Sequence, residues 1–162
     1  MTRYLVLIGT NLDRERSLAR ADAALAGRFE VLARSRVYEG DAVGDPGGPP
    51  FLNRALLLRS SLAPAALREA LRRIEADLGR VRTEDRNAPR SADLDLLLAL
   101  DDAGAALADP PAHRDLASRH YAAVPAAEIA GDARLPSGGT VAALAAALGP
   151  PPPRFRPMTD RP

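Results

Sequence analysis

Residues 79–95 concentrate arginine and aspartate side chains in a pattern that suits phosphate chemistry. The segment ends in Asp93-Leu94-Asp95, at the start of an apolar run that continues to Leu100. Residues two apart in a strand point to the same side, so both carboxylates face one way, about 6–7 Å apart along the chain. Magnesium favours one or two protein carboxylates together with phosphate oxygens. The carboxylate pair therefore predicts a divalent-cation site.

Arg80, Arg82 and Arg90 are among the four arginines that precede this pair in the segment. A guanidinium group binds phosphate oxygens through two parallel, charge-assisted hydrogen bonds. Arginines and a cation site together indicate phosphoryl or pyrophosphoryl transfer from a nucleotide. The alternative is that the two aspartates only cap the strand or form ion pairs with the arginines.

A second basic group follows in the stretch that holds both histidines of the chain, His113 and His120. His113 and Arg119 could form another wall of the phosphate site. The alternative is that they are ordinary exposed or structural side chains.

An aromatic and amide group could bind the acceptor of the transferred phosphate. Phe51 and Asn53 are two apart in an expected strand and face the same way. An amide both donates and accepts hydrogen bonds, which suits the edge of a heterocycle. Tyr121 is a candidate second aromatic wall. The alternative is that Phe51 belongs to the ordinary core.

The composition limits the remaining functions. The 162 residues contain no Cys and no Lys, so thiolate metal sites, Schiff bases and a phosphate-loop lysine are excluded. The net charge of +1 argues against broad nucleic-acid binding. We find no apolar run long enough for a signal peptide or a membrane span. We expect a cytoplasmic, monomeric enzyme that acts on small molecules, without nucleic-acid or membrane partners.

The hydrophobic pattern predicts an α+β fold with a ferredoxin-like βαββαβ core. The expected elements are strand 4–8, helix 18–25 with Ser17 as N-cap, strand 29–38, loop 40–50, strand 51–60, helix 64–78 and strand 93–100. We expect one domain over residues 1–149, which ends in an extension of short helices such as 142–148. Residues 150–162 are rich in proline and are expected to form a poorly packed tail.

These motifs, in this order, resemble those of the 6-hydroxymethyl-7,8-dihydropterin pyrophosphokinase family of folate biosynthesis. The resemblance runs from about Tyr4 to Ala130. The matching stretches are Gly9-Thr10-Asn11-Leu12, Phe51-Leu52-Asn53, Glu75 to Arg82, Pro89-Arg90-x-x-Asp93-Leu94-Asp95, and Pro111 to Tyr121 followed by Pro125-x-x-Glu128-Ile129-Ala130.

The resemblance implies transfer of pyrophosphate from ATP to the hydroxymethyl oxygen of the pterin, with release of AMP. It implies that two magnesium ions bind at Asp93 and Asp95. The ATP contacts it implies are Arg80, Arg82, Arg90, His113 and Arg119, with Arg80 and Arg90 also catalytic. The pterin contacts it implies are Gly40, Val43, Phe51, Asn53 and Tyr121. Segments 40–50 and 82–90 would be the loops that close over the substrates.

Two departures from the family pattern concern these loops. The usual Arg-Trp-Gly-Pro-Arg is Arg86-Asn87-Ala88-Pro89-Arg90 here, and the usual Thr-Pro-Pro is Gly40-Asp41-Ala42. The changes affect the lid and one pterin wall, whereas the metal and phosphate residues are complete. A paralogue that acts on another hydroxymethyl heterocycle, or a non-catalytic nucleotide-binding regulator, is therefore an alternative that the sequence leaves open.

Overall fold

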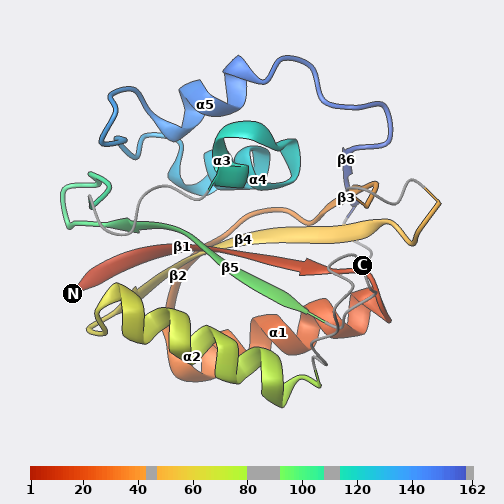
Figure 1. Ribbon diagram of the computed structural model, residues 1–162, viewed down its shortest axis with the longest axis horizontal. Helices are drawn as coiled ribbons and strands as arrows, with labels where there is room; N and C mark the ends of the chain where they lie inside the picture. The colour runs from red at the N-terminus through yellow and green to blue at the C-terminus, as the bar shows by residue number, and fades with distance from the viewer. Residues whose placement is uncertain (43–46, 80–91, 108–113, 160–162) are drawn as a thin grey trace.

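The computed structural model describes residues 1–42, 47–79, 92–107 and 114–159. An antiparallel sheet separates two helical layers, with α1 and α2 on one face and α3, α4 and α5 on the other (Figure 1). The strands are β1 (Thr2–Thr10), β2 (Glu30–Arg34), β3 (Tyr38–Gly40), β4 (Phe51–Ser60), β5 (Asp93–Leu100) and β6 (Arg156–Pro157). The helices are α1 (Arg14–Arg28), α2 (Pro64–Asp77), α3 (Arg114–Ser118), α4 (His120–Ala130) and α5 (Val141–Ala147).

The sheet has the order β5-β1-β4-β3-β6, and β2 also pairs with β4. All strand pairs within the described residues are antiparallel. β1 therefore lies between β4 and β5. This is the arrangement of the ferredoxin-like βαββαβ core, so the predicted fold class is confirmed.

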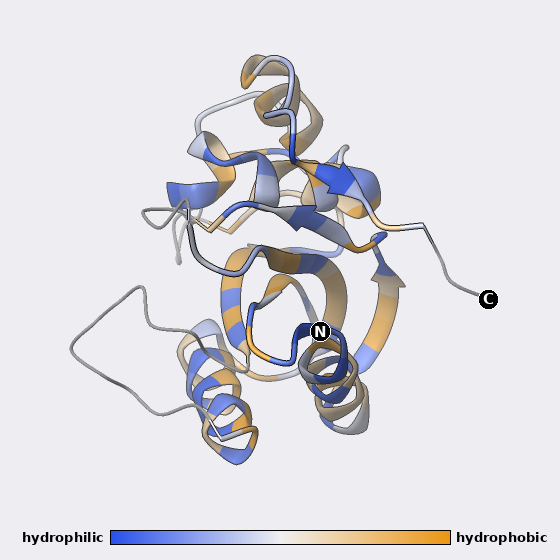
Figure 2. Ribbon diagram, turned by 90° about the vertical axis from the view of Figure 1, so that its right-hand side faces the viewer, coloured by the Kyte–Doolittle hydropathy of each residue, from blue (hydrophilic) through white to orange (hydrophobic). Residues whose placement is uncertain are grey.

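The side chains of β1 divide the core into two halves because successive residues point to opposite faces. Tyr4, Val6 and Ile8 pack against α1 and α2. Leu5 and Leu7 face the layer formed by α3, α4 and α5. Both faces of the central strand are thus buried, and the strands are mainly hydrophobic (Figure 2). This buried sheet carries the polar residues of the candidate site at one end.

The predicted start of α1 is wrong. The helix begins at Arg14, and Ser17 lies inside its first turn, where its amide donates to the carbonyl of Asp13. The Ser17 hydroxyl donates instead to the carbonyl of Leu12 at 2.7 Å. The first residues of α1 are polar, so the hydrophobic pattern did not mark the true start of the helix.

The predicted strand 29–38 is divided into β2 and β3, which pair with different parts of β4. Ser35 lies at the break. Its hydroxyl accepts the amide of Ala55 at 2.9 Å, as a strand carbonyl would, and its own amide donates to the carbonyl of Ala55. Gly40 was expected in the following loop but ends β3.

The predicted loose packing of the C-terminal segment is also wrong for residues 155–158. Two residues of this segment form β6, which pairs with β3. The amide of Met158 donates to the carbonyl of Val37 at 2.7 Å, and the side chain packs against the core beside α1 and α2. None of the described helices is long and apolar enough to cross a membrane.

Candidate active site

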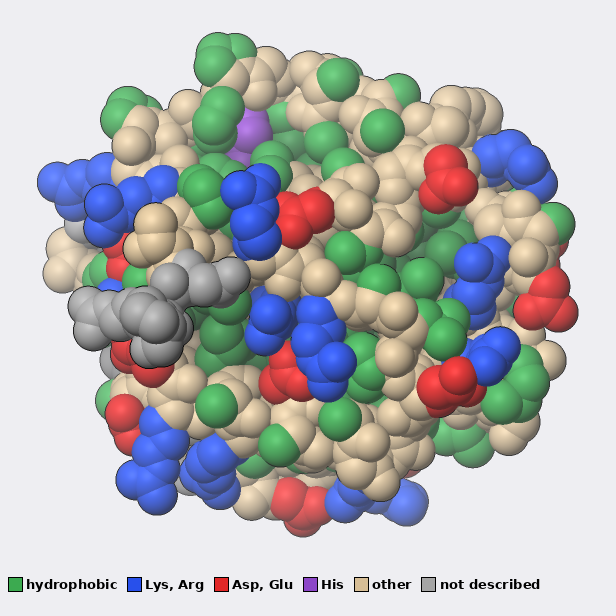
Figure 3. All heavy atoms as spheres, turned by 180° about the vertical axis from the view of Figure 1, so that it is seen from behind, with side chains coloured by type: hydrophobic (Ala, Val, Ile, Leu, Met, Phe, Trp, Pro, Cys, Tyr) green, Lys and Arg blue, Asp and Glu red, His purple; other side chains and the backbone are tan. Residues whose placement is uncertain are grey.

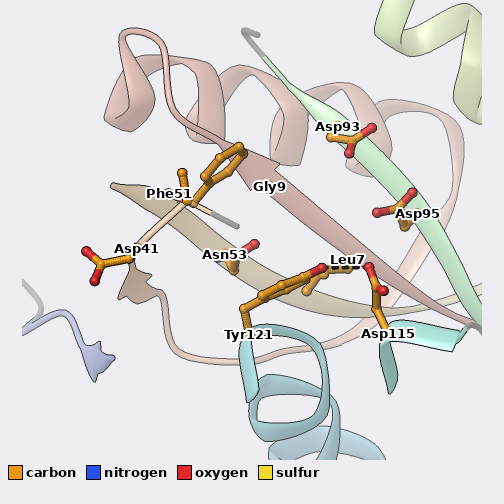
Figure 4. A pocket seen from close by; sticks show the side chains of 10 residues that line it. Leu7, Gly9, Asp41, Phe51, Asn53, Asp93, Asp95, Asp115 and Tyr121 are labelled. Atoms are coloured by element: carbon orange, nitrogen blue, oxygen red, sulfur yellow. Dashed lines mark hydrogen bonds between the residues drawn. The ribbon is translucent and has the colours of Figure 1, made fainter. Parts of the chain in front are cut away.

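A cavity of about 180 Å³ lies at the end of the sheet, on the face that carries α3 and α4. The lining residues are Leu7, Gly9, Asp41, Ala42, Phe51, Asn53, Asp93, Asp95, Asp115 and Tyr121. Figure 4 shows Asp93 and Asp95 next to each other on β5, across the cavity from Phe51. Five residues expected from the sequence thus meet in one place: Asp93, Asp95, Phe51, Asn53 and Tyr121.

The register of the strands explains why these residues meet. Gly9 of β1 lies opposite Asn53 on one side and opposite Asp93 on the other. Leu7 lies opposite Asp95. Because cross-strand partners point to the same face of the sheet, the acidic and amide side chains converge above β1.

Gly9 keeps the floor of the cavity open. A Cβ atom at this position would lie 3.2 Å from Oδ1 of Asn53 and 3.7 Å from Cδ1 of Phe51. Any larger side chain would occupy the space between the amide and the carboxylates. The sequence showed Gly9 only as a turn after a strand and as part of the family motif.

A buried carboxylate fixes the start of β5. Glu75 of α2 is only 5% exposed, and its Oε1 accepts the backbone amide of Leu94 at 2.7 Å. Leu94 stands between the two aspartates and packs into the core. The backbone that carries Asp93 and Asp95 is therefore held from the opposite layer of the molecule.

The carboxylate pair fits a magnesium ion. Asp93 and Asp95 are half-buried, line the same cavity and supply hard oxygen ligands. Within the described residues no group of three or more His, Cys, Asp or Glu side chains could hold a metal ion. Two carboxylates that leave positions for phosphate oxygens and water are what magnesium accepts at nucleotide sites.

Asp115 is a residue of the cavity that the sequence did not single out. The hydroxyl of Tyr121 donates to Oδ2 of Asp115 at 2.6 Å (Figure 4). Burial, together with this hydrogen bond, raises the pKa of Tyr121 well above its usual value. The tyrosine therefore keeps its proton at all physiological pH values and remains a hydrogen-bond donor. Nothing in the spacing of Asp115 and Tyr121 predicts that they meet.

We expect the ring of Tyr121 to matter more than its hydroxyl. Tyr121→Phe should change acceptor affinity by no more than about threefold, because the aromatic wall remains. Tyr121→Ala should weaken acceptor binding about tenfold or more through lost aromatic contact. Titration of the acceptor into each variant measures both effects. A larger loss in Tyr121→Phe than in Tyr121→Ala would contradict this assignment.

Two other predicted residues, Gly40 and Arg119, line a neighbouring cavity of about 160 Å³ rather than the one above. Arg119 is exposed and directly precedes α4. The two cavities share Asp41 and Tyr121. The predicted residues Val43, Arg80, Arg82, Arg90 and His113 lie outside the described residues, as do Asn87 and Ala88.

The carboxylate pair, the amide and the two aromatic rings suit an enzyme that binds a metal-bound phosphate beside a small aromatic molecule. Comparisons with known proteins identify the family. A sequence model of the 7,8-dihydro-6-hydroxymethylpterin-pyrophosphokinase (HPPK) family matches residues 5–131. The chain is 37% identical to the 2-amino-4-hydroxy-6-hydroxymethyldihydropteridine pyrophosphokinase of Pseudomonas aeruginosa, over 90% of this chain and 91% of that one. It is 38% identical to the enzyme of the same name from Methylorubrum extorquens, over 93% and 96%.

A solved structure of Plasmodium falciparum HPPK-DHPS has the same fold. It superposes with a TM-score of 0.63 over 91% of this chain and 43% of that longer one, at 10% sequence identity. The chain belongs to the HPPK family. It is a pyrophosphokinase of folate biosynthesis that transfers pyrophosphate from ATP to 6-hydroxymethyl-7,8-dihydropterin, so the function predicted from the motifs is confirmed.

Proposed function

We propose that the cavity between β4, β5 and α4 is where pyrophosphate transfer takes place. The observation that carries this proposal is the row of Asp93, Gly9 and Asn53 across three adjacent strands. The row sets a cation-binding carboxylate and an amide on either side of a residue without a side chain. The distance between the Asp93 carboxylate and the Asn53 amide is thus set by the spacing of the strands, which is about 4.8 Å for each step across the sheet.

In this proposal the acceptor pterin lies between Phe51 and Tyr121, with its polar edge at the Asn53 amide. Phe51 and Tyr121 come from β4 and α4 and line the same cavity. Aromatic side chains bind a flat heterocycle through stacking or edge contacts. The hydroxymethyl group then points toward Asp93 and Asp95.

Asp93 and Asp95 would hold the magnesium ions, which neutralise phosphate charge and bring the attacking and transferred groups together. The hydroxymethyl oxygen attacks the β-phosphorus of ATP, and the bond from that phosphorus to the oxygen shared with the α-phosphate breaks. AMP leaves with the bonding electrons, and the hydroxyl proton is released. Transfer of this kind depends on alignment and on charge neutralisation more than on covalent help from the protein.

The ATP contacts at Arg80, Arg82, Arg90, His113 and Arg119 stay predictions, as does the Val43 contact to the pterin. Arg119 has one supporting observation, because it lines the neighbouring cavity, which shares Asp41 and Tyr121 with the proposed site. In a view from behind, arginine side chains lie among acidic ones and form no continuous basic surface on the part of that face that is described (Figure 3). This agrees with small-molecule substrates. The monomeric state and the cytoplasmic location also stay predictions.

The direct test is AMP formation from ATP and magnesium, with and without the reduced hydroxymethylpterin. We expect AMP to appear only with the pterin and in equal amount to the pyrophosphorylated product. ATP binding without AMP formation would favour the non-catalytic alternative. Turnover with another hydroxymethyl heterocycle, but not with the pterin, would favour the paralogue.

A further inference from the structure

The C-terminal segment 150–159, here called the strap, lies beyond the residues that the family model matches, which end at 131. The strap runs from the end of α5 to the edge of the sheet, where β6 pairs with β3 (Figure 1). Arg156 lies opposite Glu39, and Pro157 lies opposite Tyr38. The strap thus forms an edge strand at the site end of the sheet.

Phe155 is the main apolar contact of the strap with β3. Its ring stacks on the ring of Tyr38, with centroids 5.2 Å apart and an angle of 5° between the planes. Its Cδ2 atom lies only 3.1 Å from the point where a Cβ atom of Gly40 would be. Phe155 therefore fills the space that the missing side chain of Gly40 leaves. Tyr38 is held in turn by α4, because its hydroxyl donates to Glu128 at 2.5 Å.

Charged contacts attach the strap to the same strand. Arg156 donates to Oε1 of Glu39 at 3.1 Å, and Arg14 of α1 lies 2.5 Å from Oε2 of the same carboxylate. Burial alone would raise the pKa of Glu39, but the hydrogen bonds from Arg14 and Arg156 lower it below its usual value. Arg154 lies 3.7 Å from Asp41 at the surface. One carboxylate thus ties the strap, β3 and α1 together.

The strand that the strap holds is paired with the acceptor-binding part of β4. Gly40 lies opposite Phe51, and Tyr38 lies opposite Asn53. The chain then continues into Asp41 and Ala42, which line the cavity. A shift of β3 away from β4 would move both the backbone of the acceptor residues and one wall of the cavity.

We propose that Phe155 is a positioning residue for acceptor binding, which acts by pressing β3 against the β4 residues Phe51 and Asn53. The inference rests on the proposed acceptor site in the cavity. Phe155 itself does not line that cavity, so it acts through Tyr38 and Gly40. It should affect the binding of the pterin more than that of ATP. Phe155 lines the neighbouring cavity together with Arg119, but the other predicted ATP contacts lie outside the described residues.

The test is Phe155→Ala in the full chain, with Phe29→Ala as the matched control. Phe29 is also a half-buried phenylalanine, but it packs against the core on the opposite face of the sheet. We expect Phe155→Ala to raise the KM and Kd for the pterin about tenfold, with kcat and ATP affinity within about twofold. Amide exchange at Gly40 and Phe51 should speed up in the same variant. Phe29→Ala should lower the melting temperature without changing either constant.

Phe155→Leu keeps apolar volume at this position and should recover part of the affinity. If Phe155→Ala fails to fold, the pterin affinity of Phe155→Leu tests the inference instead. Pterin binding that is unchanged in the Phe155 variants would overturn the inference, as would an equal loss in Phe29→Ala. Asn53→Ala separates the two proposals: if it also binds the pterin normally, the proposed acceptor site is wrong, whereas a loss in Asn53→Ala alone refutes only the role of the strap.

Discussion

Asp93→Ala and Asp95→Ala should each reduce kcat/KM by about a thousandfold or more, because each removes a proposed ligand of the magnesium ions that would neutralise the charge of the transferred phosphates. The two side chains line the cavity and are half-buried at the start of β5, outside the hydrophobic core. We therefore expect the melting temperature to change little. Steady-state AMP release and the magnesium dependence of ATP binding measure the effect.

Asp102→Ala is the matched control, since Asp102 is exposed and follows the other end of the same strand. It should behave like the wild-type protein in both assays. Activity within a few fold of the wild type in both cavity variants would show that Asp93 and Asp95 do not bind the catalytic metal. A loss of activity with normal magnesium-dependent ATP binding would instead assign the carboxylates to the acceptor.

Elements with a strong and continuous hydrophobic pattern could be predicted from the sequence. Strands β4 and β5 have the expected bounds, and α2 begins at Pro64 as expected. The division between β2 and β3 could not be predicted, because it depends on a hydrogen bond from Ala55, twenty residues away, to the Ser35 hydroxyl. The alternation of apolar and polar residues around Ser35 would be the same whether or not the Ser35 hydroxyl accepted this hydrogen bond.

The C-terminal strap shows that proline content alone could not predict how this segment packs. Its prolines argue against a helix or a central strand, and they do so correctly. An edge position remains open to proline, and Pro157 occupies one beside β3. Phe155 and Met158 give the segment enough apolar contact to stay attached.

The carboxylate pair could be predicted because its geometry is local. Two residues in i and i+2 positions of a strand share a face whatever the rest of the fold does. Gly9 and Asp115 could not be found in this way, because one depends on the register of three strands and the other on how α3 and α4 lie on the sheet. The departure from the family motif at Asn87 and Ala88 lies outside the described residues, and its effect on activity stays a prediction.

The register also makes Gly9 a sensitive point of the proposed acceptor site. Gly9→Val would add a branched side chain where even a single Cβ atom lies 3.2 Å from Oδ1 of Asn53. β4 holds Asn53 in place, and its side chain is only 4% exposed, so it has little room to move. We expect the KM for the pterin to rise on the order of a hundredfold, since small displacements of reacting groups are costly. ATP affinity should stay within a few fold.

Gly27→Val provides the control, because a Cβ atom at Gly27 would meet nothing within 4 Å. Its effect should be confined to a small change in the stability of α1, because valine has a slightly higher helix propensity than glycine. Calorimetric titration of each substrate into both variants separates acceptor binding from nucleotide binding. Normal pterin affinity in Gly9→Val would move the acceptor away from the cavity floor. Equal losses for both substrates would mean that the substitution distorts the sheet itself, and the carboxylates with it.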